Sequence, residues 1–257
     1  MSENTNPTPE QHHFISPSHL ERYDKCPGAL RLTYGIPDVK SPAGLEGTIY
    51  HGKIAAAILN LLDGKEIDET DPIIVRSVQK FKELAMDNSI IPWTNAKKVL
   101  VEHEMTVPMD DEVYAAFQQM MRNLGASEEE IAFLRDWRGT ADVAIVDAST
   151  KVGMVIDWKT GKEKVTPAES NLQGVSYACM LANEFHLEKV YVAFYSPRIE
   201  WGGEPFLFDS AMLAHGKARI QDIMMRAFQP TAEFSPGQQC TWCKAKEKCP
   251  LTAKQNS

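Results

Sequence analysis

The sequence predicts a protein of the α/β (α+β) class, with a mixed central sheet flanked by helices. Two observations predict this class. Strand-like segments with alternating or β-rich composition recur at residues 97–107, 138–147, 151–159 and 190–195, and segments with helical spacing of apolar residues surround them. The chain has 257 residues, of which 43% are hydrophobic, so it can bury a sizeable core.

The domain organisation follows from where the composition changes. Residues 1–14 are polar and rich in Pro, Asn and Gln, so we expect a disordered tail. One domain is expected over 15–250, and 251–257 should form a second tail. No apolar run approaches the roughly 20 residues of a membrane span, and the N-terminus lacks a signal-peptide pattern. We therefore expect a soluble, cytoplasmic protein that does not bind membranes.

Capping residues and apolar spacing predict the helices. Ser16-Pro17 should open a short helix toward Cys26, with proline at its first position. Thr166-Pro167-Ala168-Glu169 matches a capping box and predicts a helix from there to about Phe185. Helical spacing or composition predicts further helices over 45–62, 71–86, 110–137 and 209–228, and 206–208 is a possible short strand.

Two acidic residues and a lysine stand out on the strands predicted over 138–147 and 151–159. The two-residue strand period puts Asp157 and Lys159 on one face, and hairpin pairing could bring Asp142 near Asp157. Converging carboxylates suit a hard cation such as Mg²⁺. An isolated Asp-x-Lys is more often an exposed ion pair of little energetic value. The motif therefore needs support from other parts of the chain.

That support comes from the following helix. Gln173 and Tyr177 are four residues apart, so they share a helical face that would pack toward the end of the hairpin. Taken alone, this pair also fits a solvated glutamine and a core tyrosine. Glu102 and Glu104 lie on one side of the strand over 97–107, where they are interpreted as surface charges that could still influence a nearby metal.

The cysteines form a second pattern. Cys240-x2-Cys243-x5-Cys249 offers three ligands near the C-terminus, and Cys26 can supply a fourth. In a reducing compartment such cysteines favour metal binding over disulfides, and thiolates select either zinc or an iron–sulfur cluster. Cys179 lies on an apolar helix face and is interpreted as a core residue. Residues 15–40 and 230–250 would then join the two ends of the domain through a four-cysteine metal cluster.

In its order of motifs, the chain resembles the RecB-like branch of the PD-(D/E)XK nucleases, which includes CRISPR adaptation nucleases and has phage-encoded relatives. The motifs are Glu46-Gly-Thr-x-x-His51, Gly139-Thr-Ala-Asp142, Asp157-Trp-Lys159 and Gln173-x-x-x-Tyr177, followed by the C-terminal cysteines. The resemblance runs from about Ser16 to Pro250. It implies a restriction-endonuclease-like fold, and the split of one N-terminal and three C-terminal cysteines implies a [4Fe–4S] cluster rather than zinc.

The resemblance also implies roles for individual residues. His51, Asp142, Asp157 and the backbone carbonyl of Trp158 would ligate Mg²⁺ or Mn²⁺, and Lys159 would orient and help deprotonate the attacking water. Gln173 and Tyr177 would support the site or contact the DNA. Cys26, Cys240, Cys243 and Cys249 would hold the cluster.

The function that follows is a DNA exonuclease acting on ends, in recombination, repair or phage DNA metabolism, in a bacterial or phage-infected cell. Alternatives are a structure-specific endonuclease, a processing subunit that works with a recombination partner protein or as a homo-oligomer, or a non-catalytic DNA-binding module stabilised by its cluster. The net charge of −8 supplies no overall attraction to DNA. A local group of lysines, Lys159, Lys162 and Lys164, could supply it beside the carboxylates.

Overall fold

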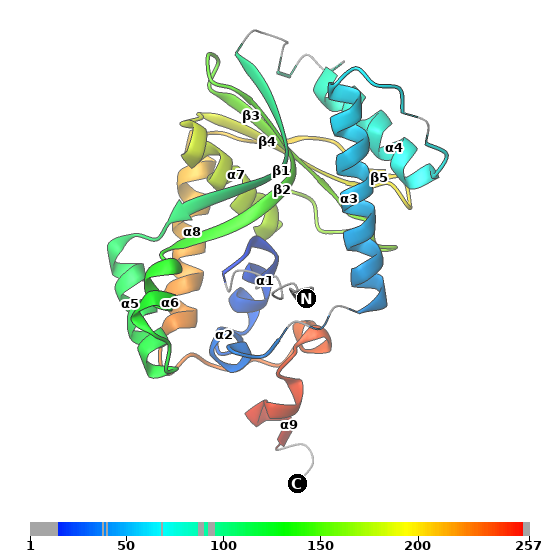
Figure 1. Cartoon of the computed structure of the whole chain (residues 1–257). Coiled ribbons are helices and arrows are strands. Elements are labelled where there is room, and N and C mark those ends of the chain that lie inside the picture. The colour runs from blue at the N-terminus through cyan, green and yellow to red at the C-terminus, as the bar shows by residue number, and fades with distance from the viewer. Residues whose placement is uncertain are drawn as a thin grey trace, which may run out of the picture.

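The computed structural model describes residues 15–37, 39, 41–67, 69–86, 90–91 and 96–253. Residues 1–14 and 254–257, which belong to the two predicted tails, lie outside the described residues. Helices cover both faces of a central sheet in the described part of the chain (Figure 1). The prediction of an α/β class with a mixed sheet is therefore confirmed.

The sheet is mixed because three neighbouring strands are antiparallel and the fourth is parallel to its neighbour. β1 (Lys97–Pro108) pairs with β2 (Asp136–Asp147), and β2 forms the predicted hairpin with β3 (Val152–Trp158). β4 (Lys189–Ser196) runs parallel to β3, and the short strands β5 (Trp201–Gly202) and β6 (Phe206–Phe208) pair with β4. The hairpin turn is stabilised by Asp147, whose carboxylate accepts backbone N–H bonds from Ser149 and Thr150.

Each face of the sheet buries its own apolar core. On one face Val155 and Ala144 pack with α1 (Pro17–Lys25), α2 (Ala29–Thr33), α5 (Asp111–Asn123), α6 (Glu128–Phe133), α7 (Leu172–Phe185) and α8 (Ser210–Phe228). On the other face Ile156 and Met154 pack with α3 (Pro42–Leu62), α4 (Pro72–Phe81) and the π-helical turn Lys82–Met86. Successive side chains of β3 therefore point alternately toward α7 and toward α3.

Two helix predictions are corrected. The segment predicted to be helical over 110–137 breaks at Gly125, which has a φ of +84°, and residues from Asp136 onward already belong to β2. The helix predicted from Thr166 begins instead at Leu172, because the side chain of Asn171 accepts the N–H of Gln173 at 2.9 Å and caps it there. Gln173 consequently lies in the first turn of α7, close to the end of β3.

The two ends of the domain lie side by side, since the C-terminal segment returns to α1 and α2 (Figure 1). This segment contains η2 (Gln238–Trp242), η3 (Lys246–Lys248) and α9 (Pro250–Ala253). The N–H of Gly28 donates to the carbonyl of Glu233 at 2.8 Å. A Cβ at Gly28 would lie 2.7 Å from the Phe234 ring, so this approach requires glycine. No helix among the described residues is long and apolar enough to cross a membrane.

Candidate metal centre

Three carboxylates form one row across neighbouring strands. Val101 pairs with Val143 and His103 with Ala141, so Glu102 lies opposite Asp142. The next pair of strands matches Val143 with Ile156, and Asp142 and Asp157 are the residues just beyond this pair on β2 and β3. Like charges directly opposite each other destabilise a sheet. Asp142 and Asp157 are also almost fully buried, with 7% and 4% of their surface exposed, so the row needs a compensating cation.

The backbone is unusual where the row crosses β1. Glu102 has a φ of +51°, a left-handed conformation that residues with a side chain rarely adopt. Such strained positions cluster at functional sites, because the surrounding structure must hold them in place. Here the sheet pairing on both sides of Glu102 keeps the residue opposite Asp142.

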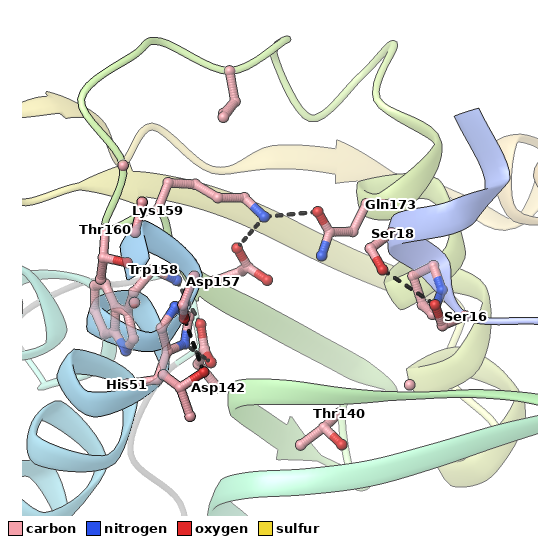
Figure 2. Close-up of a pocket in the computed structure, with 18 of the residues that line it drawn as sticks. Ser16, Ser18, His51, Thr140, Asp142, Asp157, Trp158, Lys159, Thr160 and Gln173 are labelled. Atoms are coloured by element: carbon pink, nitrogen blue, oxygen red, sulfur yellow. Dashed lines mark hydrogen bonds and ion pairs between the residues drawn. The ribbon is translucent and has the colours of Figure 1, made fainter. Parts of the chain in front are cut away.

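His51 on α3 completes a set of possible metal ligands (Figure 2). Its Nδ1 lies 2.7 Å from Oδ1 of Asp142, while Oδ2 of Asp142 accepts the backbone N–H of Trp158 at 2.6 Å. Among the described residues, one ligand atom from each of His51, Glu102 and Asp142 lies within 4.8 Å of the other two. Imidazole nitrogen and carboxylate oxygens together suit a divalent first-row cation or Mg²⁺.

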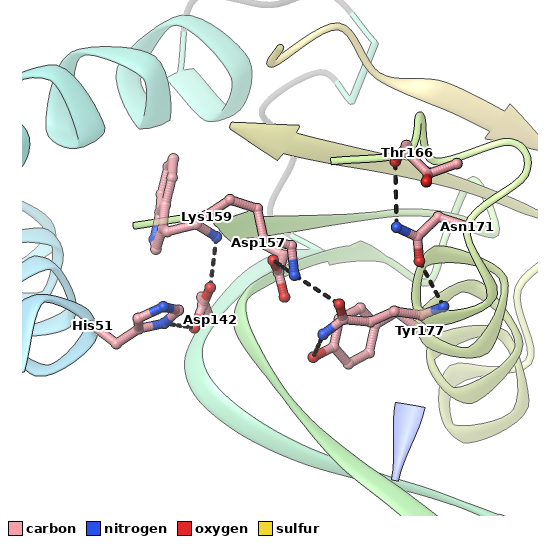
Figure 3. A network of polar contacts seen from close by, with 9 residues as sticks. His51, Asp142, Asp157, Lys159, Thr166, Asn171 and Tyr177 are labelled. Atoms are coloured by element: carbon pink, nitrogen blue, oxygen red, sulfur yellow. Dashed lines mark hydrogen bonds and ion pairs between the residues drawn. The ribbon is translucent and has the colours of Figure 1, made fainter. Parts of the chain in front are cut away.

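Lys159 lies on the opposite side of the row, in a chain of polar contacts that leads to α7 (Figure 3). Its Nζ is 2.7 Å from Oδ2 of Asp157 and donates to Oε1 of Gln173 at 2.7 Å. The amide of Gln173 in turn donates to the hydroxyl of Tyr177 at 3.0 Å. The Lys159 ammonium also lies 4.8 Å from the centre of the Phe194 ring. These contacts hold the ammonium at one position next to Asp157.

The pKa values of Asp157, Glu102 and His51 are all raised at this site. Burial raises the pKa of Asp157 more than the charge of Lys159 lowers it, and burial together with the charge of Asp142 raises the pKa of Glu102. For His51, burial acts to lower the pKa, but the hydrogen bond and charge of Asp142 outweigh it, so the pKa of His51 is raised. Neighbouring carboxylates contribute to each of these shifts beside the effect of burial, and a bound divalent cation would act against their contribution.

A cleft of about 1490 Å³ opens over the row (Figure 2). Its floor carries the carboxylates and Lys159, and its walls come from the start of α1, from α3 and from the loop that follows β3. A Cβ at Gly139 would lie 2.6 Å from the ring of Pro17, so glycine at this position lets the start of α1 close one side of the cleft. The exposed residues Lys162 and Lys164 line the loop side.

The structure brings the predicted residues His51, Asp142, Asp157, Lys159, Gln173 and Tyr177 to this one cleft. Glu102 is exposed, as expected from its interpretation as a surface charge, and it also lies beside His51 and Asp142, where it can influence a metal and is itself a possible ligand. The signal that could have found it is the antiparallel register, which puts residue 102 opposite 142 once β1 and β2 are paired. Trp158 contributes an N–H to Asp142, and its carbonyl as a metal ligand stays a prediction.

A second cavity of about 200 Å³ lies between the two ends of the domain, but among the described residues the four predicted cluster cysteines are not gathered there into a close ligand set. Cys26, Cys240, Cys243 and Cys249 all line it, and the thiol of Cys26 accepts the N–H of Ser235 at 3.4 Å. Within the described part of the chain, no three of these thiols lie within 4.8 Å of one another. Cys179 is buried in the core, as predicted, and burial raises the pKa of its thiol to about 12.

Comparisons with known proteins give a family and several similar solved structures. One of these structures, described as "Crystal structure of SSO0001", is similar with a TM-score of 0.43 at 12% sequence identity, over 95% of this chain and 89% of that chain. A family model described as "Protein of unknown function (DUF2800)" matches residues 12–257, nearly the whole chain. The chain therefore belongs to the DUF2800 family.

Proposed function

We propose that this protein is a Mg²⁺- or Mn²⁺-dependent deoxyribonuclease that hydrolyses phosphodiester bonds at DNA ends. One observation carries the proposal. Asp142 and Asp157 lie side by side on neighbouring strands, and the ammonium of Lys159 is held 2.7 Å from Asp157 at the floor of an open cleft. Two carboxylates, a fixed cation and access for a large substrate are what metal-assisted phosphodiester hydrolysis requires.

The ligand set of the cation would include His51, Asp142 and Asp157, with Glu102 within reach and the Trp158 carbonyl as a further candidate. When bound, the cation would act as a Lewis acid on the scissile phosphate and would lower the pKa of a bound water. Lys159 would hold the attacking water beside Asp157, because its Nζ already bridges Asp157 and Gln173. Gln173 and Tyr177 are positioning residues, since they contact Lys159 or each other.

The charges around the cleft support a polyanionic substrate despite the acidic chain. Arg138 and Arg198 line the cleft but lie within ion-pairing distance of Glu104 and Glu46, at 3.5 and 3.0 Å. Lys162 and Lys164 are exposed on the loop after β3, next to the carboxylate row, where they could bind phosphates on either side of the scissile bond. We propose that these local cations attract the DNA backbone, which the net negative charge of the whole chain does not.

The cysteine cavity supports a [4Fe–4S] cluster as the second cofactor. Four cysteines line one cavity of about 200 Å³, so the set of ligands is complete. Thiolates around a single zinc ion lie roughly 3.8 Å apart, given a Zn–S distance of about 2.3 Å and tetrahedral geometry. In the described part of the chain no three of these thiols lie within 4.8 Å of one another. The choice of a [4Fe–4S] cluster over zinc therefore rests on the resemblance to iron–sulfur members of the RecB-like family, which have one N-terminal and three C-terminal cysteines. The cluster would join the chain ends.

End-labelled DNA tests the nuclease directly. Anaerobically purified protein is incubated with linear single-stranded and double-stranded DNA, with and without Mg²⁺ or Mn²⁺. We expect metal-dependent release of short products from linear DNA, and little cleavage of circular single-stranded DNA. Cleavage of the circle at a comparable rate would indicate an endonuclease.

The catalytic residues are tested by two variants with matched controls. Asp157→Asn and Lys159→Ala should each reduce the rate by about 10²–10⁴-fold. Asp147→Asn and Lys151→Ala are the controls. Asp147 is also a buried carboxylate, at the C-terminal end of β2, and Lys151 is an exposed lysine just before β3. Equal activity of Asp157→Asn and the wild type would refute the proposed site.

A further inference from the structure

Trp242 is an exposed aromatic residue on the rim of the cleft. Its side chain lines the same cleft as Asp157 and Lys159, although 78% of its surface is exposed to solvent. Trp137 and Trp158, by contrast, are buried in the two cores. Exposing a whole indole is unfavourable, since burial of a large apolar side chain stabilises the folded protein. An exposed indole that lines a cleft is therefore placed where it can contact a ligand in that cleft.

The backbone of Trp242 is held firmly while its ring stays accessible. Trp242 is the last residue of the short helix η2 and lies between Cys240 and Cys243 in the sequence. The N–H of Cys243 donates to the carbonyl of Cys240 at 3.3 Å. The guanidinium of Arg22 on α1 donates to the carbonyl of Trp242 at 3.1 Å. The ring position is consequently determined by the junction of the two chain ends rather than by packing of the ring itself.

We propose that Trp242 is a stacking platform for an unpaired nucleobase, so that the cleft takes single-stranded DNA or a frayed duplex end. This inference rests on the proposed nuclease function, because it names the form of substrate that reaches the carboxylate row. Stacking suits any base, since every base offers an aromatic face. A base inside an intact duplex is already stacked on its neighbours and cannot reach the indole.

The surroundings of Trp242 favour a nucleic acid over a protein partner. The segment from Cys240 to Cys249 contains Lys244, Lys246 and Lys248 against a single acidic residue, Glu247, in a chain whose net charge is −8. All three lysines are exposed. Alternation of aromatic and cationic groups along a groove is typical of surfaces that bind single strands without sequence preference. Lys162 and Lys164 on the loop after β3 line the same cleft.

Binding to oligonucleotides that lack bases separates stacking from charge. Fluorescence anisotropy without added divalent metal would measure the affinity for a labelled oligo-dT, for the same oligomer with abasic sites, and for a blunt duplex. The wild type should bind the intact oligomer roughly 5- to 150-fold more tightly than Trp242→Ala does. The abasic oligomer should bind equally to both proteins, because its phosphates are unchanged. Trp242→Phe should recover part of the affinity.

Trp201→Ala is the matched control, since Trp201 is a partly exposed tryptophan on β5 that does not line the cleft. It should bind as the wild type does. Trp242→Ala should keep the iron content and melting temperature of the wild type, because only the backbone of Trp242 makes a hydrogen bond in the described contacts. An affinity of Trp242→Ala for oligo-dT equal to that of the wild type would overturn the inference, as would equal loss with the abasic oligomer.

The outcome is distinguishable from failure of the proposed function. If Trp242→Ala binds normally while the wild type cleaves DNA in a metal-dependent manner, the nuclease stands and the stacking platform is refuted. If the wild type binds oligo-dT through Trp242 but Mg²⁺ and Mn²⁺ elicit no cleavage, the stacking platform stands and the nuclease is refuted. An RNA oligomer that binds as tightly as oligo-dT would show that the site also accepts RNA, with Trp242 still the residue that stacks on the base.

Discussion

The two candidate metal sites are built in opposite ways. The carboxylate row lies on three adjacent strands of the central sheet, where the register determines which side chains are neighbours and contacts of 2.7 Å are already present. The four cysteines come from the two ends of the domain and line a smaller cavity, without close contact among any three described thiols. A sheet can preorganise ligands that repel each other, whereas ligands on chain ends gain from the cofactor that joins them.

Loss of the cluster should be the largest effect. If the proposed cluster is present, the purified wild type should be brown and contain iron, and Cys243→Ser should lose both and melt roughly 5–15 °C lower, taking about 2–4 kcal/mol for a lost cross-link. Iron analysis and thermal unfolding under anaerobic conditions would measure both. Cys179→Ala is the control, because Cys179 lies in the core, and it should retain full iron content. Zinc in stoichiometric amount without iron would contradict the cluster.

The carboxylate row should respond differently, because removing a charge helps the metal-free fold. Glu102→Gln should weaken Mn²⁺ binding about 10- to 100-fold, while the melting temperature of the metal-free protein stays equal or rises, since repulsion with Asp142 is relieved. Calorimetric titration and thermal unfolding would measure these two effects. Glu104→Gln is the control, because Glu104 lies two residues along β1 within reach of Arg138. A lower melting temperature with unchanged Mn²⁺ affinity would contradict a ligand role.

The difference between the two sites also explains what the sequence could predict. The hairpin, and hence the proximity of Asp142 and Asp157, follows from local alternation and a turn, which are readable in one sequence. The sequence indicated only that Glu102 could influence a nearby metal, because its position opposite Asp142 depends on the register between β1 and β2, whose residues are about 40 apart in the chain. The predicted start of α7 was wrong because Asn171, and not Thr166, caps the helix.

The cysteine pattern shows the reverse case. Spacing alone grouped Cys240, Cys243 and Cys249, but only the return of the C-terminal segment to α1 brings Cys26 beside them. Nothing local in the sequence indicated that Trp242 would line the cleft, since tryptophan between two cysteines is equally compatible with a buried position.

Metal affinity at the carboxylate row should rise with pH. The pKa of His51, Glu102 and Asp157 is raised, so protons compete with the cation at higher pH than at ordinary groups. Mn²⁺ affinity should therefore increase between about pH 6 and 8, around the ordinary histidine pKa of about 6.5. The stability that protonated His51 adds to the metal-free fold is lost over the same range.

The slope of Mn²⁺ affinity against pH should become shallower in His51→Gln, and titrations at three pH values would measure it. His186→Gln, at the exposed end of α7, is the control and should keep the slope of the wild type. A pH dependence that is identical in wild type and His51→Gln would exclude His51 as a ligand.

The smallest effect is expected for the positioning residues. Tyr177→Phe removes only the hydroxyl that accepts from Gln173, so the turnover rate should fall by less than about 10-fold with Mn²⁺ affinity unchanged. Gln173→Ala should reduce turnover more, because it also frees Lys159 on one side. Steady-state kinetics with labelled DNA would rank the two. A larger loss in Tyr177→Phe than in Gln173→Ala would contradict this chain of contacts.

Locating a bound Mn²⁺ ion would be the strongest test of the proposed catalytic centre. Crystals soaked with Mn²⁺ would give an anomalous difference map at the manganese edge. We expect a peak bonded to the carboxylate row, with His51 and Asp142 among its ligands, and no such peak in Asp142→Asn. A wild-type map with manganese elsewhere, or none at the row under conditions that support cleavage, would contradict the proposal that these carboxylates form the catalytic centre.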